Sequence, residues 1–203
     1  REIIQIGANL EAQCIGIPTG KQDYYAAMYG AVNALWFHVD RDEVEPLAVH
    51  EETLRQLEGC MVLSFTGEPH FSAVTNWGML KAYIEKQGDT VGRMRQIKQT
   101  ALDMRQAILD ADIQRLADLL SQEWRNRRDL ADGVSTPQIE RIMNAAQQAG
   151  AWASKICGAG GGGCMITLAP AEKREQVVNA IRAQNARVIP FSIARKGLTV
   201  EVD

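Results

Sequence analysis

The sequence predicts an α+β fold in which an antiparallel sheet carries helices on one face. Three observations predict it. Short apolar runs rich in strand formers lie toward both ends of the chain, residues 70–150 have helical periodicity almost throughout, and a glycine run joins two apolar segments near the C-terminal end. Hydrophobic residues make up 46% of the 203 residues and charged residues 23%, which is ordinary for a globular protein.

The first third of the chain predicts two helices, a hairpin, a third helix and a strand, over residues 1–13, 22–29, 31–40 with 43–49, 51–59 and 60–67. Ile3, Ile6 and Leu10 share one face of the opening helix. Gly59 ends the third helix. The strand that follows is a continuous apolar run closed by Gly67, so we expect it to be buried on both faces.

The middle of the chain predicts four helices from apolar stripes over residues 71–84, 94–108, 113–124 and 139–146. The last of these helices has a clear start, with Ser135 or Thr136 as N-cap and Pro137 in the first turn, and it stops at Gly150. The C-terminal part predicts a hairpin around the glycine run, a helix and two more strands, over residues 152–170, 172–184, 186–194 and 197–203.

Composition excludes several classes of protein. A formal net charge of −3 and a sequence pI near 5.7 predict no nucleic-acid or anionic membrane partner, and no apolar run is long enough to span a bilayer. The four cysteines form no CxxC pair and the three histidines are scattered, which predicts reduced, mostly buried thiols in a cytoplasmic protein and no metal site. The charged run 123–129 is interpreted as a solvated helix face. Because the chain starts without Met and within a helical pattern, we expect it to be a piece of a longer one.

Two stretches carry candidate chemistry, and the first is the glycine run. Its residues are Gly158, Ala159, Gly160, Gly161, Gly162 and Gly163. Consecutive glycines raise the entropy cost of folding, so they are favoured where the backbone takes positive φ or approaches another group closely. The alternative is a flexible hairpin tip, although the apolar flanks argue against it. No Lys-Ser/Thr pair follows, so this is not a Walker loop.

The second stretch is "PTGKQD". Pro18 and Gly20 predict a turn, and Lys21, Gln22 and Asp23 follow at the entrance of a helix. The amides and dipole of that helix favour the carboxylate form of Asp23. Taken alone, the position is typical of a helix cap.

Together, "PTGKQDYYAAMYGA" and "GVSTPQIERIMNAAQQAGAWASKICGAGGGGCM" resemble the GHMP kinase superfamily, named for galactokinase, homoserine, mevalonate and phosphomevalonate kinases. The likeness is greatest to the D-glycero-D-manno-heptose 7-phosphate kinases. The resemblance implies the end of a ribosomal-S5-like N-terminal domain over residues 1–59. It also implies a GHMP-type C-terminal domain with a ferredoxin-like antiparallel sheet over residues 60–203.

The resemblance also implies roles for individual residues. Asp23 matches the catalytic aspartate, which accepts or orients the proton of the substrate hydroxyl that attacks the γ-phosphoryl of ATP. The glycine run, residues 158–163, matches a loop that packs near the substrate and phosphate loops. Five further residues are implied to lie near the substrate: Gly20, Lys21, Gln22, Thr66 and Gly67. His70 is either a phosphate contact or a solvated loop histidine.

The function implied is MgATP-dependent phosphoryl transfer to a sugar or sugar phosphate. The family's ATP phosphate loop, P-x-x-x-G-L-G-S-S-A, has no match here, and the main Mg²⁺ ligands are expected upstream as well. We therefore expect this chain alone to bind ATP poorly and to turn over negligibly. Galactokinase-like or fucokinase-like activity and a non-catalytic sugar- or nucleotide-binding regulator stay open as alternatives. The oligomeric state also stays open, with a homodimer as one alternative.

Overall fold

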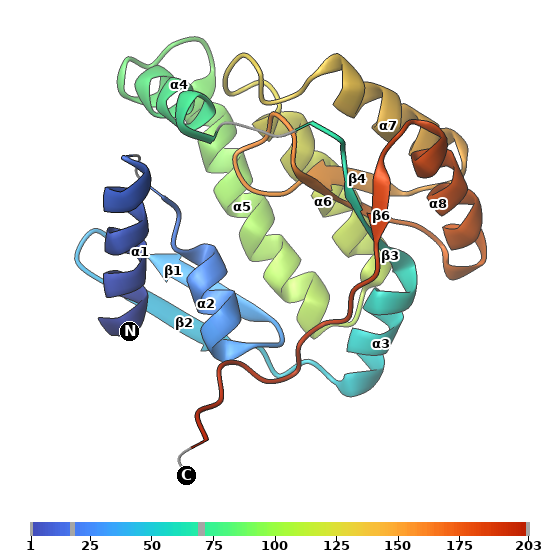
Figure 1. Ribbon diagram of the computed structural model, residues 1–203, viewed down its shortest axis with the longest axis horizontal. Helices are drawn as coiled ribbons and strands as arrows, with labels where there is room; N and C mark the ends of the chain where they lie inside the picture. The colour runs from blue at the N-terminus through green and yellow to red at the C-terminus, as the bar shows by residue number, and fades with distance from the viewer. Residues whose placement is uncertain (1, 17–18, 69–71, 202–203) are drawn as a thin grey trace. The chain divides into compact units, whose positions relative to one another are not determined.

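The computed structural model describes residues 2–16, 19–68 and 72–201 and divides the chain into two compact units (Figure 1). Unit 1 contains Arg1–His50 together with Ser192–Asp203, and unit 2 contains Glu51–Phe191. The division into domains 1–59 and 60–203 stays a prediction. Pro18, His70 and Phe71, which entered the predictions above, lie outside the described residues. In the part of the chain that is described, no helix is both long and apolar enough to cross a membrane.

Unit 1 contains the two helices and the hairpin that the sequence predicts: α1 (Glu2–Ile15), α2 (Gln22–Tyr29), β1 (Asn33–Phe37) and β2 (Asp42–Pro46), with β1 and β2 antiparallel. The buried face of α1 carries Ile4 and Ala8, at 2% and 6% exposure. The apolar stripe noted in the sequence, Ile3, Ile6 and Leu10, lies on a different face and is more than half exposed.

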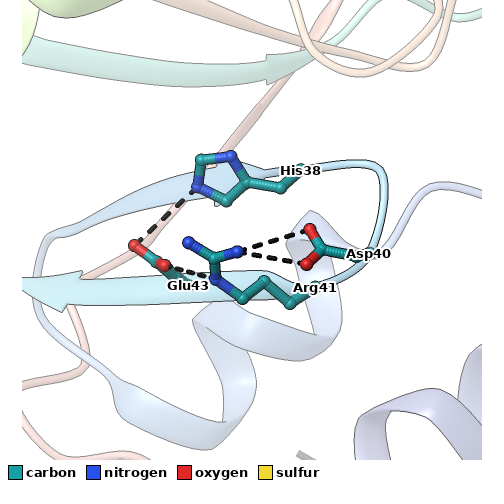
Figure 2. Close-up of polar contacts among 4 residues, drawn as sticks. All are labelled: His38, Asp40, Arg41 and Glu43. Atoms are coloured by element: carbon teal, nitrogen blue, oxygen red, sulfur yellow. Dashed lines mark hydrogen bonds and ion pairs between the residues drawn. The ribbon is translucent and has the colours of Figure 1, made fainter.

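Polar contacts among four side chains lie at the turn of the β1–β2 hairpin (Figure 2). Arg41 donates from Nε to Glu43 Oε1 at 2.8 Å, and its Nη1 lies 3.2 Å from Asp40 Oδ2. His38 Nε2 lies 3.8 Å from the second oxygen of Glu43. Because these side chains are 42–71% exposed, water and salt screen the pairs, which therefore contribute little to stability.

The C-terminal segment returns to unit 1 without forming the strand predicted over residues 197–203. In its described part, up to residue 201, the chain is irregular. Two backbone hydrogen bonds fix it: the Ala31 N–H donates to Ala194 O at 2.6 Å, and the Leu198 N–H donates to Ala27 O at 3.0 Å. The approach is so close that a Cβ on Gly197 would overlap the backbone of α2.

Unit 2 has a four-stranded antiparallel sheet in the order β4-β5-β3-β6. Its elements are α3 (Glu51–Cys60), β3 (Met61–Phe65), α4 (Ser72–Ile84), α5 (Thr90–Leu109), α6 (Ile113–Arg127), α7 (Pro137–Gln148), β4 (Ala153–Ile156), β5 (Cys164–Leu168), η1 (Ala171–Lys173), α8 (Arg174–Ala183) and β6 (Arg187–Ile189). This order with this connectivity is the ferredoxin-like arrangement, as predicted. The last strand is short because Pro190 has no N–H to continue the ladder.

One face of this sheet forms the core. Val62, Ile156 and Met165 are fully buried on it, and α7 and α8 cover it with Ile139, Ile142, Val177 and Ile181. The opposite face of β3 is only half-buried, at Met61, Leu63 and Phe65. The prediction that residues 60–67 are buried on both faces is therefore wrong, because in this antiparallel sheet burial alternates along the strand.

Candidate active site

Asp23 is the second residue of α2, and Lys21 occupies the N-cap position, so Asp23 is not the helix cap. Its side chain is exposed. Within residues 2–16, 19–68 and 72–201 its carboxylate has neither a hydrogen-bond nor an ion-pair partner. The first turn of a helix favours a negative charge at this place. The structure therefore presents an ionisable carboxylate to solvent at the start of α2.

Lys21 is bound to the hairpin of its own unit. Its Nζ lies 2.8 Å from Asp42 Oδ2, and the Tyr25 hydroxyl donates to the same oxygen at 2.9 Å. Tyr25 is 2% exposed and the Asp42 side chain 13% exposed, so this contact is largely shielded from water. Lys21 thus ties the entrance of α2 to β2, while its neighbours Gly20 and Gln22 are exposed. Asp42 lies between the two strands predicted for the hairpin, 31–40 and 43–49, and its contact with Lys21 was not predicted.

The glycine loop between β4 and β5 has a backbone that other residues rarely adopt. Its five glycines all have positive φ, between 72° and 145°: Gly158, Gly160, Gly161, Gly162 and Gly163. Ala159 between them is buried. The conformational reason given for the glycine run is confirmed, since both positive φ and close backbone approach occur here.

Backbone hydrogen bonds hold the loop on two sides. The Gly161 N–H donates to Val134 O at 2.7 Å, and the Gly163 N–H donates to Glu68 O at 2.9 Å. Thr66 donates twice to Gly163 O, from its N–H at 2.9 Å and from its hydroxyl at 3.1 Å. These bonds argue against the flexible-tip alternative. Thr66 is 1% exposed, so its hydroxyl is directed to the protein. Its predicted contact with substrate stays a prediction.

The start of α7 is joined to the same set of residues. The hydroxyl of Thr136 donates to Glu68 Oε2 at 2.8 Å and accepts from the Ile139 N–H at 3.2 Å, so Thr136 and not Ser135 is the N-cap. Gly67 is exposed, with φ of 88°. The cap at Thr136 was predictable from the sequence, whereas the bond from its hydroxyl to Glu68 was not. A hydroxyl that accepts a capping hydrogen bond can still donate its own proton, but the sequence does not identify the acceptor.

A buried group of charges lies at α6 and β4. Glu123 accepts from Arg127 Nε at 2.5 Å, its other oxygen lies 3.2 Å from Lys155 Nζ, and its side chain is 7% exposed. Burial lowers the pKa of Lys155, and the charge of Glu123 opposes that effect only in part. The interpretation of residues 123–129 as a solvated face is therefore wrong at Glu123.

The predicted site residues fall into two groups. Gly20, Lys21, Gln22 and Asp23 belong to unit 1, whereas Thr66, Gly67 and the glycine loop belong to unit 2. Among the described residues, no group of three or more His, Cys, Asp or Glu side chains could hold a metal ion. A Mg²⁺ ion bound by these residues would need further oxygen ligands, such as water and phosphate.

Comparison with known proteins gives a consistent result. Residues 104–187 match the family described as GHMP kinases C terminal. The chain is 31% identical, over 97% of its length, to the D-glycero-alpha-D-manno-heptose 7-phosphate kinase of Campylobacter jejuni, of which it spans 58%. It is 46% identical to the mevalonate kinase of Thermococcus sibiricus, but only over 69 residues, which are 34% of this chain and 20% of that one.

Solved structures agree on the fold. A D-glycero-D-manno-heptose 1-phosphate kinase from Bacteroides thetaiotaomicron superposes with a TM-score of 0.69 and 27% identity, over 98% of this chain and 55% of that one. A mevalonate kinase from L. major has a TM-score of 0.74 at 21% identity, over 88% and 53% of the two chains, which shows the fold alone. Residues 104–187 therefore form a GHMP kinase C-terminal domain, in a chain that is similar over nearly its whole length to a heptose phosphate kinase.

Proposed function

We propose that this chain is part of an ATP-dependent kinase that phosphorylates a hydroxyl of a sugar phosphate, with a heptose 7-phosphate as the leading acceptor. The observation that carries the proposal is the 31% identity to a heptose 7-phosphate kinase over 97% of this chain, which includes both candidate stretches. The mevalonate kinase match covers only 69 residues, so it supports the superfamily more than the acceptor. Residues 1–59 would then belong to the catalytic N-terminal domain and residues 60–203 to the C-terminal domain.

In this proposal Asp23 accepts or orients the proton of the attacking hydroxyl. Two features support that role: its exposed carboxylate has no hydrogen-bond or ion-pair partner in the described part of the chain, and the helix that carries it is held by the Lys21–Asp42 pair. Phosphoryl transfer depends mainly on positioning and charge stabilisation. The Asp23 carboxylate meets the need for positioning because its helix is anchored. In this proposal Lys21 acts as a positioning residue, because it provides that anchor.

The glycine loop is proposed to shape the substrate side of unit 2. Its backbone is fixed by Thr66, Glu68 and Val134, so it forms a preorganised surface. ATP is the proposed phosphoryl donor. Mg²⁺, when bound, would neutralise charge on the transferred phosphoryl group. No cluster of three or more metal-ligating side chains occurs among the described residues, so in this proposal the ATP phosphates supply part of the Mg²⁺ coordination.

The test is ADP release against heptose 7-phosphate, galactose, fucose and mevalonate. Because the chain spans 58% of the Campylobacter enzyme, it is assayed alone and fused to the preceding part of that relative. Asp23→Asn removes the proposed base, and Asp118→Asn, an exposed acid on α6, is the matched control. We expect turnover of the fusion on the heptose phosphate to fall by about 10²–10⁴-fold in Asp23→Asn alone.

Other outcomes have definite meanings. Greater turnover on mevalonate than on any sugar would mean that the acceptor is a mevalonate-type alcohol and not a sugar phosphate. ATP binding by the fusion without turnover on any acceptor would favour the non-catalytic binding protein. Full activity in Asp23→Asn would remove Asp23 from the site.

A further inference from the structure

Two cysteines lie opposite each other at the neck of the glycine loop. Cys157 directly precedes the loop and Cys164 directly follows it. The Cys157 N–H donates to Cys164 O at 2.8 Å, which continues the antiparallel register Ile156↔Met165 by one pair. Both side chains are half-buried, and both are thiols in the structure. The expectation of mostly buried thiols is thus wrong, since Cys14 is exposed and the other three are half-buried.

This register suits a disulfide. Opposed residues of an antiparallel pair direct their side chains to the same face of the sheet, and a hydrogen-bonded pair has Cα atoms about 5.5 Å apart. Disulfides span Cα separations of about 4.4–6.8 Å. Their Cβ atoms must be about 1 Å closer than in an average strand pair. Gly158 and Gly163, next to the two cysteines, have no side chains to oppose that small closure.

The charge around the pair favours reaction at Cys157. Lys155 lies two residues earlier, so its side chain is on the same strand face. Its ammonium group and the Cys157 thiolate attract each other, and the thiolate is the nucleophilic form of cysteine. Cys60 differs, because burial and Glu172 raise the pKa of its thiol.

We propose that Cys157 and Cys164 are a redox modification site, at which a peroxide converts them to a reversible disulfide across the neck of the glycine loop. The Cys157 thiolate attacks a peroxide oxygen, an S–O bond forms as the O–O bond breaks, and the hydroxide that leaves takes a proton from solvent to become water; the product is a sulfenic acid. The Cys164 sulfur then attacks the sulfenic sulfur, the S–S bond forms as the S–O bond breaks, and the departing hydroxide leaves as a second water with the proton of the Cys164 thiol. Two electrons pass from the two thiols to the peroxide, and a dithiol returns them.

The effect on activity rests on the proposed function. A shift of about 1 Å at the neck moves the loop that Thr66, Glu68 and Val134 hold. Misplacement of this size costs enzymes up to about 10²-fold in rate. Oxidation is therefore expected to inhibit the kinase reversibly. The disulfide itself is detected by mass, so its failure and the failure of the kinase proposal are distinguishable.

The chain supplies a convenient assay. Trypsin cleavage after Lys155 and Lys173 releases residues 156–173, which contain both cysteines of the pair and no other. The folded protein is treated with hydrogen peroxide, alkylated and digested. We expect this peptide to be two hydrogens lighter and unalkylated, and to return to the doubly alkylated form after dithiothreitol. The peptide that contains Cys60 should stay alkylated.

Four variants complete the test. Cys157→Ser and Cys164→Ser should each abolish the light peptide, whereas Cys60→Ser should leave it unchanged. Lys155→Met removes one tryptic site, so in this variant the pair lies in residues 142–173, and the corresponding light peptide should form more slowly. If peroxide instead carries Cys157 to a sulfinic acid while Cys164 remains alkylatable, the two sulfurs do not meet and the proposal is overturned. A disulfide between Cys60 and either partner would overturn it as well.

Discussion

Replacing Gly160 by Ala is the sharpest test of how the glycine loop is held. Gly160 has φ of 89°, and a Cβ there would lie 2.6 Å from Val134 Cγ1 and 2.7 Å from Val134 O. Left-handed backbone costs a non-glycine residue about 1–2 kcal/mol, and overpacking adds about 1–3 kcal/mol. Val134 cannot move aside easily, because it is fully buried and its oxygen accepts from Gly161. We expect a loss of about 2–5 kcal/mol in the free energy of unfolding.

Two other glycines provide matched controls. Gly158 has φ of 72° but open space around its Cβ position, so Gly158→Ala should lose only the backbone cost of about 1–2 kcal/mol. Gly59 lies in α3 with nothing within 4 Å, so Gly59→Ala should gain about 0.5–1 kcal/mol. Urea unfolding measures all three. In thermal melts Gly160→Ala should lower Tm by about 5–15 °C. Equal losses for Gly160→Ala and Gly158→Ala would refute the packing argument.

Three further predictions concern the contacts around the site. Tyr25→Phe removes the buried hydrogen bond to Asp42 and should cost about 1–3 kcal/mol in urea unfolding, whereas an unchanged midpoint would mean that the bond contributes nothing. Thr136→Ala removes the α7 cap and the bond to Glu68 and should cost about 1–2 kcal/mol, with Thr136→Ser retaining most of it. Because the folded-state pKa of Lys155 lies below its ordinary 10.5, the unfolded chain binds more protons between those two values, and stability there rises with pH. Lys155→Met should abolish that rise in urea unfolding at stepped pH, and a parallel rise in the variant would assign it to other groups.

The sequence predicted most helices, the hairpin and an antiparallel sheet with helices on one face, because these follow from periodicity, caps and turn residues. The ferredoxin-like strand order was implied by the resemblance to GHMP kinases. The sequence did not predict the alternating burial of β3, since a continuous apolar run is compatible with one or two covered faces. Nor did it place Asp42 beside Lys21 or Glu68 beside Thr136. The first pair is separated by 21 positions in the sequence and the second by 68, so only the folded chain brings each pair together.

The candidate site shows the same limit. The conformation of the glycine loop follows from its composition, whereas the acceptor of each of its N–H groups depends on neighbouring elements. The loop conformation was therefore predictable from the sequence, and its hydrogen-bond partners were not. The pairing of Cys157 with Cys164 was not predictable either, because it follows from the strand register and not from the spacing of the two cysteines along the chain.

The return of residues 192–201 to α2 makes unit 1 discontinuous in sequence, with unit 2 inserted into it. During synthesis the ribosome completes all of unit 2 before it makes the segment that unit 1 requires. Unit 2 can therefore fold early, as domains generally do on a growing chain, while unit 1 stays unfinished until residues 192–201 have been made. Its closing contacts span more than 160 positions, a separation that slows folding. A nonsense codon near residue 190 would thus damage the helix that carries Asp23 while leaving the sheet of unit 2 intact.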